Sequence, residues 1–351
     1  MPNVLTGRNR VLKALQGEPV DRLPVLCVNQ TATYEQMEIL GAAWPEANSE
    51  AEKMAELAAG SHLILGFDAV RLPFCQTIEA EAMGCVLKKG GRMNLPSVQK
   101  HPYNIDANEV SVPDDFLRLG RIPQLLEGIR LLKARVGTTA LVIGGIIGPY
   151  STAGNLLGTE ELLRKSFRQP EKLANFLAAG TQIGLALAKA EIAAGADVIC
   201  IEDMLASLDL VSPNIFREVI LPWHNHLVPA IGSVPVIMHI CGALDEVLGD
   251  VADTGVDAIS VEDKVNAKAA VAKLTAKNHP VALIGGVSAL QSLYAGTAEQ
   301  VKTAVHQAAE AGYRMIAPSC AIAPATSLIN LRAMVSAAEE TTAGSGANRK
   351  E

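Results

Sequence analysis

The sequence predicts a single (β/α)8 barrel, the fold also known as a TIM barrel. Short apolar runs alternate eight times with longer segments of helical periodicity along the 351 residues. Several runs are almost wholly apolar, as is typical of parallel strands that helices cover on both faces. Repeated alternation of strand and helix favours a closed parallel barrel. An open doubly wound sheet is the alternative. The first strand is not followed by G-x-G-x-x-G, which disfavours a dinucleotide-binding version.

We expect each apolar run to form one strand of the barrel. In chain order the runs cover residues 23–28, 69–74, 140–146, 197–203, 235–241, 258–263, 281–287 and 314–319. Two of the intervening segments carry apolar side chains at helical spacing, over 160–167 and over 171–194. These segments are predicted to be helices, and Gly195 is the expected C-cap of the second.

The chain is predicted to fold as one catalytic domain over residues 1–340. Residues 84–115 are rich in Gly, Pro and polar side chains. We expect this stretch to be an excursion at the mouth of the barrel rather than a second domain. Residues 341–351 are small and polar, so they are expected to form a disordered tail.

Composition and charge exclude several classes of partner. The net charge is −7 and no basic stripe is present, which argues against nucleic acid. No apolar run approaches the roughly 18 residues of a membrane span, because charged and polar residues break the longest one, 177–200. The N-terminus lacks the continuous apolar stretch of a signal peptide. We therefore expect a cytoplasmic protein whose six scattered cysteines are reduced.

A histidine and two cysteines at strand ends predict a zinc site. His239 and Cys241 are two residues apart, so in a strand they face the same side, and Gly242 suits a tight exit turn. Cys320 follows the eighth predicted strand, and the carboxyl ends of barrel strands meet at one mouth. Imidazole and two thiolates favour zinc, and three protein ligands leave one position for substrate. Alone, each could be a packed core residue, which is also how we interpret Cys200.

Acidic residues at two other strand ends are further candidates for the site. Glu262 or Asp263 could complete the metal coordination when substrate is absent, and the alternative is a salt bridge with Lys264. Asp203 ends the fourth run. It could orient the ligand histidine or bind substrate, and the alternative is an N-cap for the next helix.

Three remaining features receive simpler interpretations. Gly285-Gly286 lies in the seventh run, where barrel loops often hold anions, but a plain tight turn is the preferred reading. His224 and His226 lie outside the strand ends, and we interpret both as ordinary polar residues.

At this point the chain resembles a known family, the methylcobamide:coenzyme M methyltransferases of the uroporphyrinogen decarboxylase superfamily. The matching segments span nearly the whole chain. They are GEPVDRLP at 17–24, GAAWPEA at 41–47, RLPFC at 71–75, HICG at 239–242, ISVEDKV at 259–265 and APSCAIAP at 317–324. The first segment is shared across the superfamily, whereas HICG and the late cysteine are more specific.

The resemblance implies a uroporphyrinogen decarboxylase-like barrel with zinc on the equivalents of His239, Cys241 and Cys320. An acidic residue near Glu262 would occupy the fourth position until a thiol displaces it. The reaction implied moves a methyl group from a corrinoid protein to the thiol of coenzyme M. The chain has no recognisable corrinoid-binding module, so methylcobamide would be presented by a separate partner protein. Gln30, Tyr150 and Asp203 are candidates for lining the pocket.

Departures from the family pattern bear mainly on the acceptor and on decarboxylation. Ala243-Leu244-Asp245 follows HICG, where small polar residues are expected, and Ser319 and Ala321 flank Cys320 in place of glycines. The decarboxylase branch carries an arginine-rich segment after its first strand. Residues 27–33 contain no arginine, which counts against decarboxylation of a substrate with several carboxylates.

Three alternatives stay open beside transfer to coenzyme M. The same zinc chemistry could serve tetrahydrofolate or another thiol as acceptor. A uroporphyrinogen decarboxylase would need no metal. A zinc-stabilised scaffold or corrinoid-binding partner would be a non-enzyme, and it would hold its metal with four protein ligands.

Overall fold

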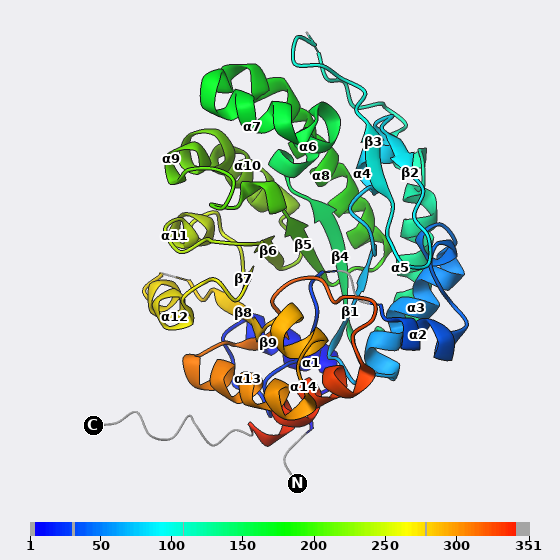
Figure 1. Cartoon of the computed structure of the whole chain (residues 1–351), viewed down its shortest axis with the longest axis vertical. Helices are drawn as coiled ribbons and strands as arrows, with labels where there is room; N and C mark the ends of the chain where they lie inside the picture. The colour runs from blue at the N-terminus through cyan, green and yellow to red at the C-terminus, as the bar shows by residue number, and fades with distance from the viewer. Residues whose placement is uncertain (1–3, 30–31, 108, 278, 342–351) are drawn as a thin grey trace.

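A curved sheet of parallel strands lies at the centre of the molecule, and helices surround it (Figure 1). The computed structural model describes residues 4–29, 32–107, 109–277 and 279–341. The strand order in the sheet is β1-β4-β5-β6-β7-β8-β9. The strand bounds are β1 Ala69–Leu72, β4 Leu141–Ile147, β5 Val198–Glu202, β6 Val236–Ile240, β7 Ala258–Val261, β8 Ala282–Val287 and β9 Met315–Pro318. The predicted barrel fold and seven of the predicted strands are thus confirmed.

The predicted first strand is the exception, because residues 23–28 form only an isolated bridge. Val25 bridges Ile316 of β9 in parallel, and the Leu26 N–H donates to the Ile316 carbonyl over 3.0 Å. On the other side, the Asp68 N–H donates to the Val25 carbonyl over 2.7 Å, directly before β1. This segment therefore closes the barrel between β9 and β1. Its pairing is short because Pro24 has no N–H to donate and the chain bends at residues 28–29.

Helices pack outside the strands and connect them. Their bounds are α1 Gly7–Leu15, α2 Tyr34–Leu40, α3 Ala51–Leu63, α4 Ile78–Ala82, α5 Ile122–Val136, α6 Pro149–Leu157, α7 Thr159–Arg168, α8 Ala174–Ala194, α9 Pro213–Ile215, α10 Leu221–Ile231, α11 Leu248–Ala252, α12 Ala267–Thr275, α13 Ala298–Ala311 and α14 Leu328–Glu340. The helix predicted over 160–167 is α7. The helix predicted over 171–194 is a 3-10 turn, Pro170–Leu173, followed by α8, and Gly195 caps it in the left-handed region.

By length and composition alone, the segment Pro170–Ala194 could cross a membrane, contrary to the expectation from sequence. Half of its apolar window is buried, and α8 packs against α6 and α10. That packing accounts for its apolar character, as expected of a core helix. The excursion at 84–115 carries an antiparallel pair, β2 Val86–Lys88 and β3 Ser97–Lys100. Of the predicted tail, residues 342–351 lie outside the described residues.

The barrel interior changes from apolar to polar toward the carboxyl ends of the strands. At the amino end, inward side chains such as Leu141 and Ile237 form one apolar cluster with α1. Because alternate residues of a strand face the same side, the next inward positions hold polar side chains. These are Arg71 of β1, Glu202 of β5, His239 of β6 and Ser260 of β7, and all four are buried.

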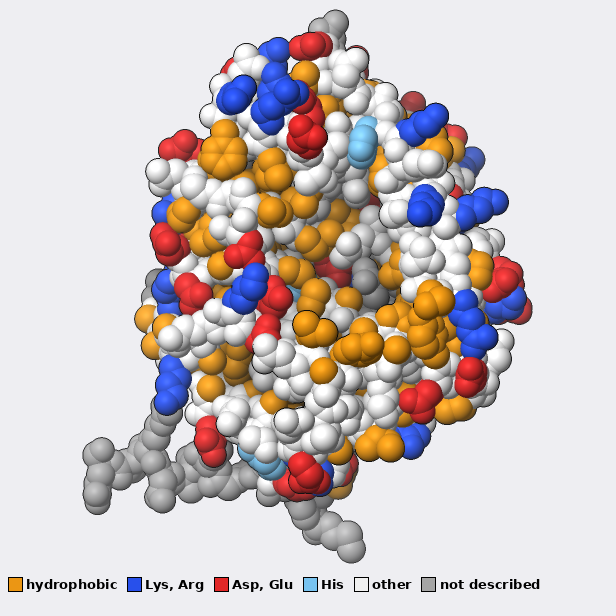
Figure 2. Space-filling model, in the orientation of Figure 1, with side chains coloured by type: hydrophobic (Ala, Val, Ile, Leu, Met, Phe, Trp, Pro, Cys, Tyr) orange, Lys and Arg blue, Asp and Glu red, His pale blue; other side chains and the backbone are white. Residues whose placement is uncertain are grey.

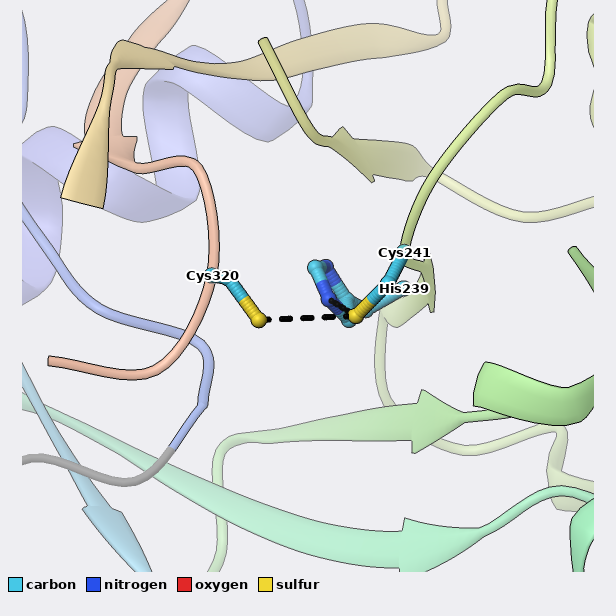
Figure 3. Close-up of side chains that lie close together, drawn as sticks. All are labelled: His239, Cys241 and Cys320. Atoms are coloured by element: carbon cyan, nitrogen blue, oxygen red, sulfur yellow. Dashed lines mark hydrogen bonds between the residues drawn. The ribbon is translucent and has the colours of Figure 1, made fainter. Parts of the chain in front are cut away.

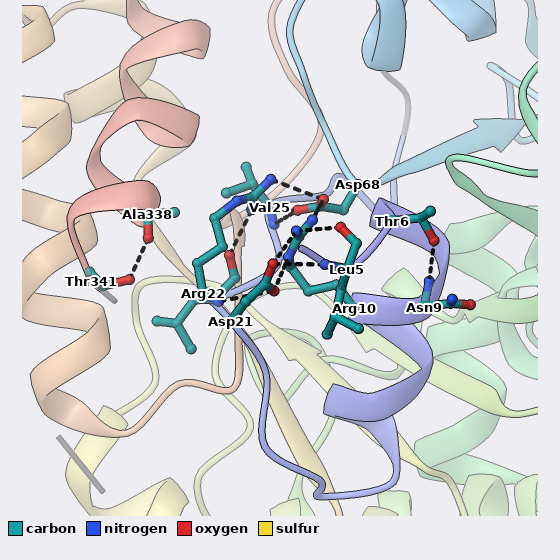
Figure 4. Close-up of polar contacts among 11 residues, drawn as sticks. Leu5, Thr6, Asn9, Arg10, Asp21, Arg22, Val25, Asp68, Ala338 and Thr341 are labelled. Carbon is teal, nitrogen blue, oxygen red and sulfur yellow. Dashed lines mark hydrogen bonds and ion pairs between the residues drawn. The ribbon is translucent and has the colours of Figure 1, made fainter. Parts of the chain in front are cut away.

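Ion pairs hold together the segments at the amino end of the barrel (Figure 4). Arg10 of α1 contacts Asp21 at 2.7 Å and Asp68 at 2.5 Å. Arg22 contacts the other oxygen of Asp68 at 2.7 Å, and the same oxygen accepts from the Val25 N–H over 2.8 Å. The segment 17–24, shared across the superfamily, therefore holds the closing segment of the barrel to strand β1. None of the bonds described here reaches the predicted metal site.

Candidate metal centre

The three predicted zinc ligands come together at the carboxyl ends of the strands. His239, Cys241 and Cys320 each offer one ligand atom, and these atoms all lie within 4.8 Å of one another. Figure 3 shows the two cysteine side chains pointing toward each other from opposite sides of the cluster. His239 Nε2 is 3.0 Å from Cys241 Sγ, and Cys241 Sγ is 3.5 Å from Cys320 Sγ.

The chain geometry around β6 and β9 explains this meeting. His239 lies inside β6 and faces the barrel interior, and Cys241 follows at the next inward position. Gly242 has a φ of +75°, and a side chain at this position would overlap Ser207 and Asp209, so only glycine fits the turn. Cys320 lies two residues beyond the end of β9, across the mouth.

The spacing and donor set fit zinc. Zinc–sulfur bonds of about 2.3 Å in a tetrahedral site place two sulfurs roughly 3.8 Å apart, close to the separation of Cys241 and Cys320. His239 Nδ1 lies 3.0 Å from Ser260 Oγ on β7, the strand in register beside it. With Nδ1 engaged by Ser260, Nε2 is directed at the two sulfurs. Second-layer hydrogen bonds of this kind orient metal-binding histidines.

The two thiols differ in acidity. The hydrogen bond between them, and then burial, raise the pKa of Cys241, with smaller contributions from the charges of Cys320, Glu202 and Glu262. The same hydrogen bond lowers the pKa of Cys320, against the effect of burial and with help from His239. Cys320 is therefore the more readily deprotonated of the two, and the thiolate is the form of cysteine that binds a metal.

Glu262 lies beside the cluster but outside it. Its carboxylate accepts a hydrogen bond from the Gly242 N–H, directly after Cys241. Lys264 pairs with Asp209 at 2.6 Å rather than with Glu262 or Asp263, so the alternative interpretation of this segment as a salt bridge does not hold. Glu262 and Cys320 both line an open cavity of about 640 Å³, together with Ser288, Gln291, Tyr294 and Ser319. On the face drawn in Figure 2 the molecule is hollowed at its centre, and the hollow is largely lined with hydrophobic side chains.

Comparison with known proteins decides the family. The family model for uroporphyrinogen decarboxylase (URO-D) matches residues 6–341. The chain belongs to the uroporphyrinogen decarboxylase family. Within that family it is 38% identical over 335 residues to methylcobamide:CoM methyltransferase MtaA of Methanosarcina barkeri, covering 95% of this chain and 98% of that protein. It is 36% identical over 336 residues to methylcobamide:CoM methyltransferase MtbA of Methanosarcina acetivorans, with the same coverage of both chains.

A solved structure and a more distant sequence relative agree with this placement. A methyltransferase from Methanosarcina mazei superposes with a TM-score of 0.91 at 38% identity, covering 96% of this chain and 99% of that one. Uroporphyrinogen decarboxylase of Geotalea uraniireducens is more distant, at 26% identity over 271 residues, 73% of this chain and 77% of that protein. This member of the family is thus similar to the methyltransferases over at least 95% of its length.

In this uroporphyrinogen decarboxylase family member, Asp203 does not orient the metal-site histidine. That position belongs to Ser260, which the sequence analysis missed. The Asp203 carboxylate is fully buried, and it accepts from the N–H and hydroxyl of Ser151 at 2.7 Å, at the start of α6. It also lies 2.7 Å from His224 Nε2. Asp203 therefore caps a helix, although α6 rather than the next helix in sequence, and His224 is a buried partner rather than an ordinary polar residue.

The candidates for lining the pocket gain no support. Tyr150 is fully buried, and its hydroxyl lies 2.7 Å from Ser166 Oγ. Burial raises the pKa of Tyr150 to about 12. Tyr150, at the start of α6, therefore has its ring in the core, and its place in the pocket lining stays a prediction. Gln30 lies outside the described residues.

The structure also corrects the interpretation of the double glycine as a tight turn. Gly285-Gly286 lies inside β8 and not in a turn, with φ values of +145° and +96°. A Cβ at Gly285 would lie 2.9 Å from the Val261 carbonyl oxygen, and one at Gly286 would overlap Ala308 of α13. These glycines let β8 pack closely against β7 and its covering helix.

His226 is exposed, as its interpretation as an ordinary polar residue requires, and Cys200 is fully buried among apolar side chains, as expected.

Proposed function

We propose that this chain is a zinc-dependent methyltransferase that moves a methyl group from a methylated corrinoid protein to coenzyme M. The observation that carries the proposal is the cluster of His239, Cys241 and Cys320 at the barrel mouth, beside an open cavity. Full-length relatives named methylcobamide:CoM methyltransferase support the same reaction.

In this proposal His239 Nε2 and the sulfurs of Cys241 and Cys320 hold the metal. Zinc, when bound, supplies a Lewis acid that makes the thiolate form of an acceptor available at neutral pH. Ser260 fixes the orientation of the His239 ring. Glu262, kept beside Cys241 by the Gly242 N–H, is assigned the fourth position in the absence of the thiol.

In the transfer itself, the protein positions the two reactants and excludes water. The acceptor sulfur forms a bond to the methyl carbon, the bond from cobalt to that carbon breaks, and its electron pair stays on cobalt. The cavity beside Cys320 offers the acceptor an approach to the cluster from the open face. The corrinoid, presented by its own protein, would approach over the hollow drawn in Figure 2. Alignment of the two reactants is the expected source of acceleration.

The alternatives differ in acceptor, metal and ligand number. A relative from Methanosarcina mazei at 31% identity is named methylated-thiol–coenzyme M methyltransferase, which favours a thiol over tetrahydrofolate as acceptor. Decarboxylation has no use for a cluster of two thiolates and an imidazole. A zinc-stabilised scaffold would hold four permanent protein ligands, whereas three donor groups are grouped here among the residues described, and the fourth position is one that Glu262 gives up to the thiol.

Ligand variants test the proposal. Cys241→Ala and Cys320→Ala should each reduce bound zinc from one per chain to a small fraction, because losing a thiolate removes one of three ligands. Methyl transfer from methylcobalamin to coenzyme M should fall with the metal, at least a hundredfold, while circular dichroism shows an intact barrel. Cys85→Ala, a buried cysteine outside the cluster, is the matched control and should keep both zinc and activity.

Two results would contradict the proposal. One zinc held tightly in both ligand variants would show that the metal ligands are misassigned. Full transfer activity after complete zinc removal would show that the chemistry needs no metal. Parallel assays with tetrahydrofolate and with other thiols identify the acceptor.

A further inference from the structure

A buried ion pair lies in the barrel beside the metal centre and has no part in the ligand set. Arg71 Nη2 is 3.2 Å from Glu202 Oε2, and the two side chains are only 2% and 0% exposed. Arg71 belongs to the middle of β1, whereas Glu202 is the last residue of β5. Neither residue drew attention in the sequence as a candidate for the site.

The fold reserves room for the cation. A Cβ at Gly145 of β4 would overlap the guanidinium of Arg71, so a side chain at this inward position would displace it. Arg71 Nη1 also donates to the Pro73 carbonyl over 2.8 Å. Gly145 thus leaves space for the guanidinium, and the Pro73 carbonyl holds it in place. Closer to the amino end of the strands, the barrel interior is lined with apolar side chains.

The Glu202 carboxylate is held by two amide donors in addition to Arg71. Glu202 Oε1 accepts from Asn29 Nδ2 over 2.8 Å, and Oε2 accepts from Gln76 Nε2 over 2.8 Å beside Arg71. These bonds make Glu202 a fixed negative charge rather than a mobile side chain.

Glu202 is a direct neighbour of the metal centre. It pairs in register with His239 on β6, and the Asp203 N–H donates to the His239 carbonyl over 3.0 Å. Arg71 belongs to β1, which β4 separates from β5 in the sheet, so it has no such register with β6. The negative end of the pair is therefore the end that adjoins the cluster.

Stability gives no reason to keep such a pair. Replacing a buried ion pair by apolar residues of similar volume is often neutral or stabilising, since both charges lose their hydration. A charge that remains inside a barrel next to reactive groups calls for a functional explanation.

We propose that Glu202, held in place by Arg71, tunes the metal centre by making it less favourable for the anionic form of the acceptor sulfur. This inference rests on the proposed function. When the acceptor sulfur takes the methyl group, its negative charge disappears and the neutral thioether is formed. A fixed negative charge nearby raises the energy of the thiolate more than that of the transition state, where the charge is already partly lost. The barrier to transfer falls accordingly.

The two partners predict opposite effects on thiol binding. Glu202→Gln removes the negative charge and leaves the arginine cation, so the zinc-loaded protein should bind coenzyme M about tenfold more tightly. Arg71→Met leaves the negative charge uncompensated and should weaken binding by a similar factor, about tenfold. Binding is measured by calorimetry at fixed pH, without the methyl donor. Glu202→Gln should also transfer the methyl group more slowly at saturating thiol, despite its tighter binding.

Controls separate this role from folding. Since a lone buried charge can unfold the protein, the variant Arg71→Met/Glu202→Gln removes both charges together. It should fold, keep one zinc, and bind coenzyme M more tightly than the unmodified protein, because the charge it removes from the strand position beside His239 is the negative one. Glu127→Gln, in the exposed pair of Glu127 and Arg130, should leave the affinity unchanged.

The outcomes are distinguishable. Unchanged or weaker thiol binding in folded, zinc-loaded Glu202→Gln or in the double variant would overturn this inference and leave the proposed function standing. A zinc-loaded, unmodified protein that binds no thiol would overturn both.

Discussion

At the scale of single residues, Ser260 sets which ring nitrogen of His239 is directed at the metal site. Its hydroxyl lies 3.0 Å from His239 Nδ1, and it is fully buried on the strand beside β6. A neutral imidazole has one donor and one acceptor nitrogen, so engaging Nδ1 as the donor leaves Nε2 free to coordinate.

Removing that hydroxyl should weaken zinc binding without removing a ligand. We expect Ser260→Ala to raise the zinc dissociation constant by roughly 10- to 100-fold, as is typical for loss of such supporting bonds. Competition with a chelator measures it. Ser260→Thr keeps a hydroxyl at the same position and should retain most of the affinity. Equal losses in both variants would indicate a packing effect and contradict the orienting role.

The sequence predicted the three ligands because strand alternation and the common mouth of a barrel are enough to group them. It did not predict Ser260, Arg71 or Glu202. These are single polar residues inside apolar strands, and their importance depends on which strand lies beside them, which only the register shows. Asp203 was misinterpreted because a strand-end position does not tell which helix N-terminus its carboxylate will reach.

At the scale of elements, β8 depends on two glycines where the sequence suggested a turn. The strand pattern in 281–287 was recognised, but the close approach of β8 to α13 was not, since it depends on Ala308, which lies 22 residues after Gly286 in the covering helix. The predicted strand at 23–28 failed for a related reason, because a closing strand needs partners on both sides and the sequence does not show how long they stay paired.

Gly286→Ala should therefore destabilise the protein by about 2–4 kcal/mol, by adding overpacking against Ala308 to the strain of a positive φ. Urea unfolding measures the change. Gly255→Ala is the matched control, because Gly255 has a φ of +92° with nothing within 4 Å of an added Cβ. It should cost only about 1–2 kcal/mol for the backbone. Equal losses at the two positions would show that the contact with α13 is unimportant.

At the scale of the whole molecule, the two ends of the barrel have different tasks. Ion pairs of Arg10, Asp21, Arg22 and Asp68 fasten the amino end, and the metal centre lies at the carboxyl end. The alternating sequence predicted a barrel, but how residues 24–26 and 68 close it appeared only in the structure. The charges of the shared segment 17–24 serve this closure.

The ion pairs at the amino end predict how the free energy of unfolding depends on pH. Burial alone would raise the pKa of Asp21, but bonds from Arg10 and the Leu5 N–H outweigh it and lower the pKa from 3.8 to about 2. A depressed pKa stabilises the fold above pH 4, and the contribution disappears as the pH falls from about 4 to 2. Asp21→Asn should therefore lose about 1 kcal/mol at pH 7, after allowance for solvent screening, and the deficit should vanish near pH 2. Urea unfolding at several pH values checks it. A deficit that is constant with pH would contradict the assignment, and methyl transfer should be unaffected.

The central claim is that a metal held by His239, Cys241 and Cys320 keeps one position for an incoming sulfur. X-ray absorption at the zinc edge of the full-length protein, with and without coenzyme M, tests it most directly. We predict two sulfur neighbours and one imidazole at rest, rising to three sulfurs when the thiol is added. Protein purified without zinc, or a sulfur count that the thiol leaves unchanged, would contradict the account.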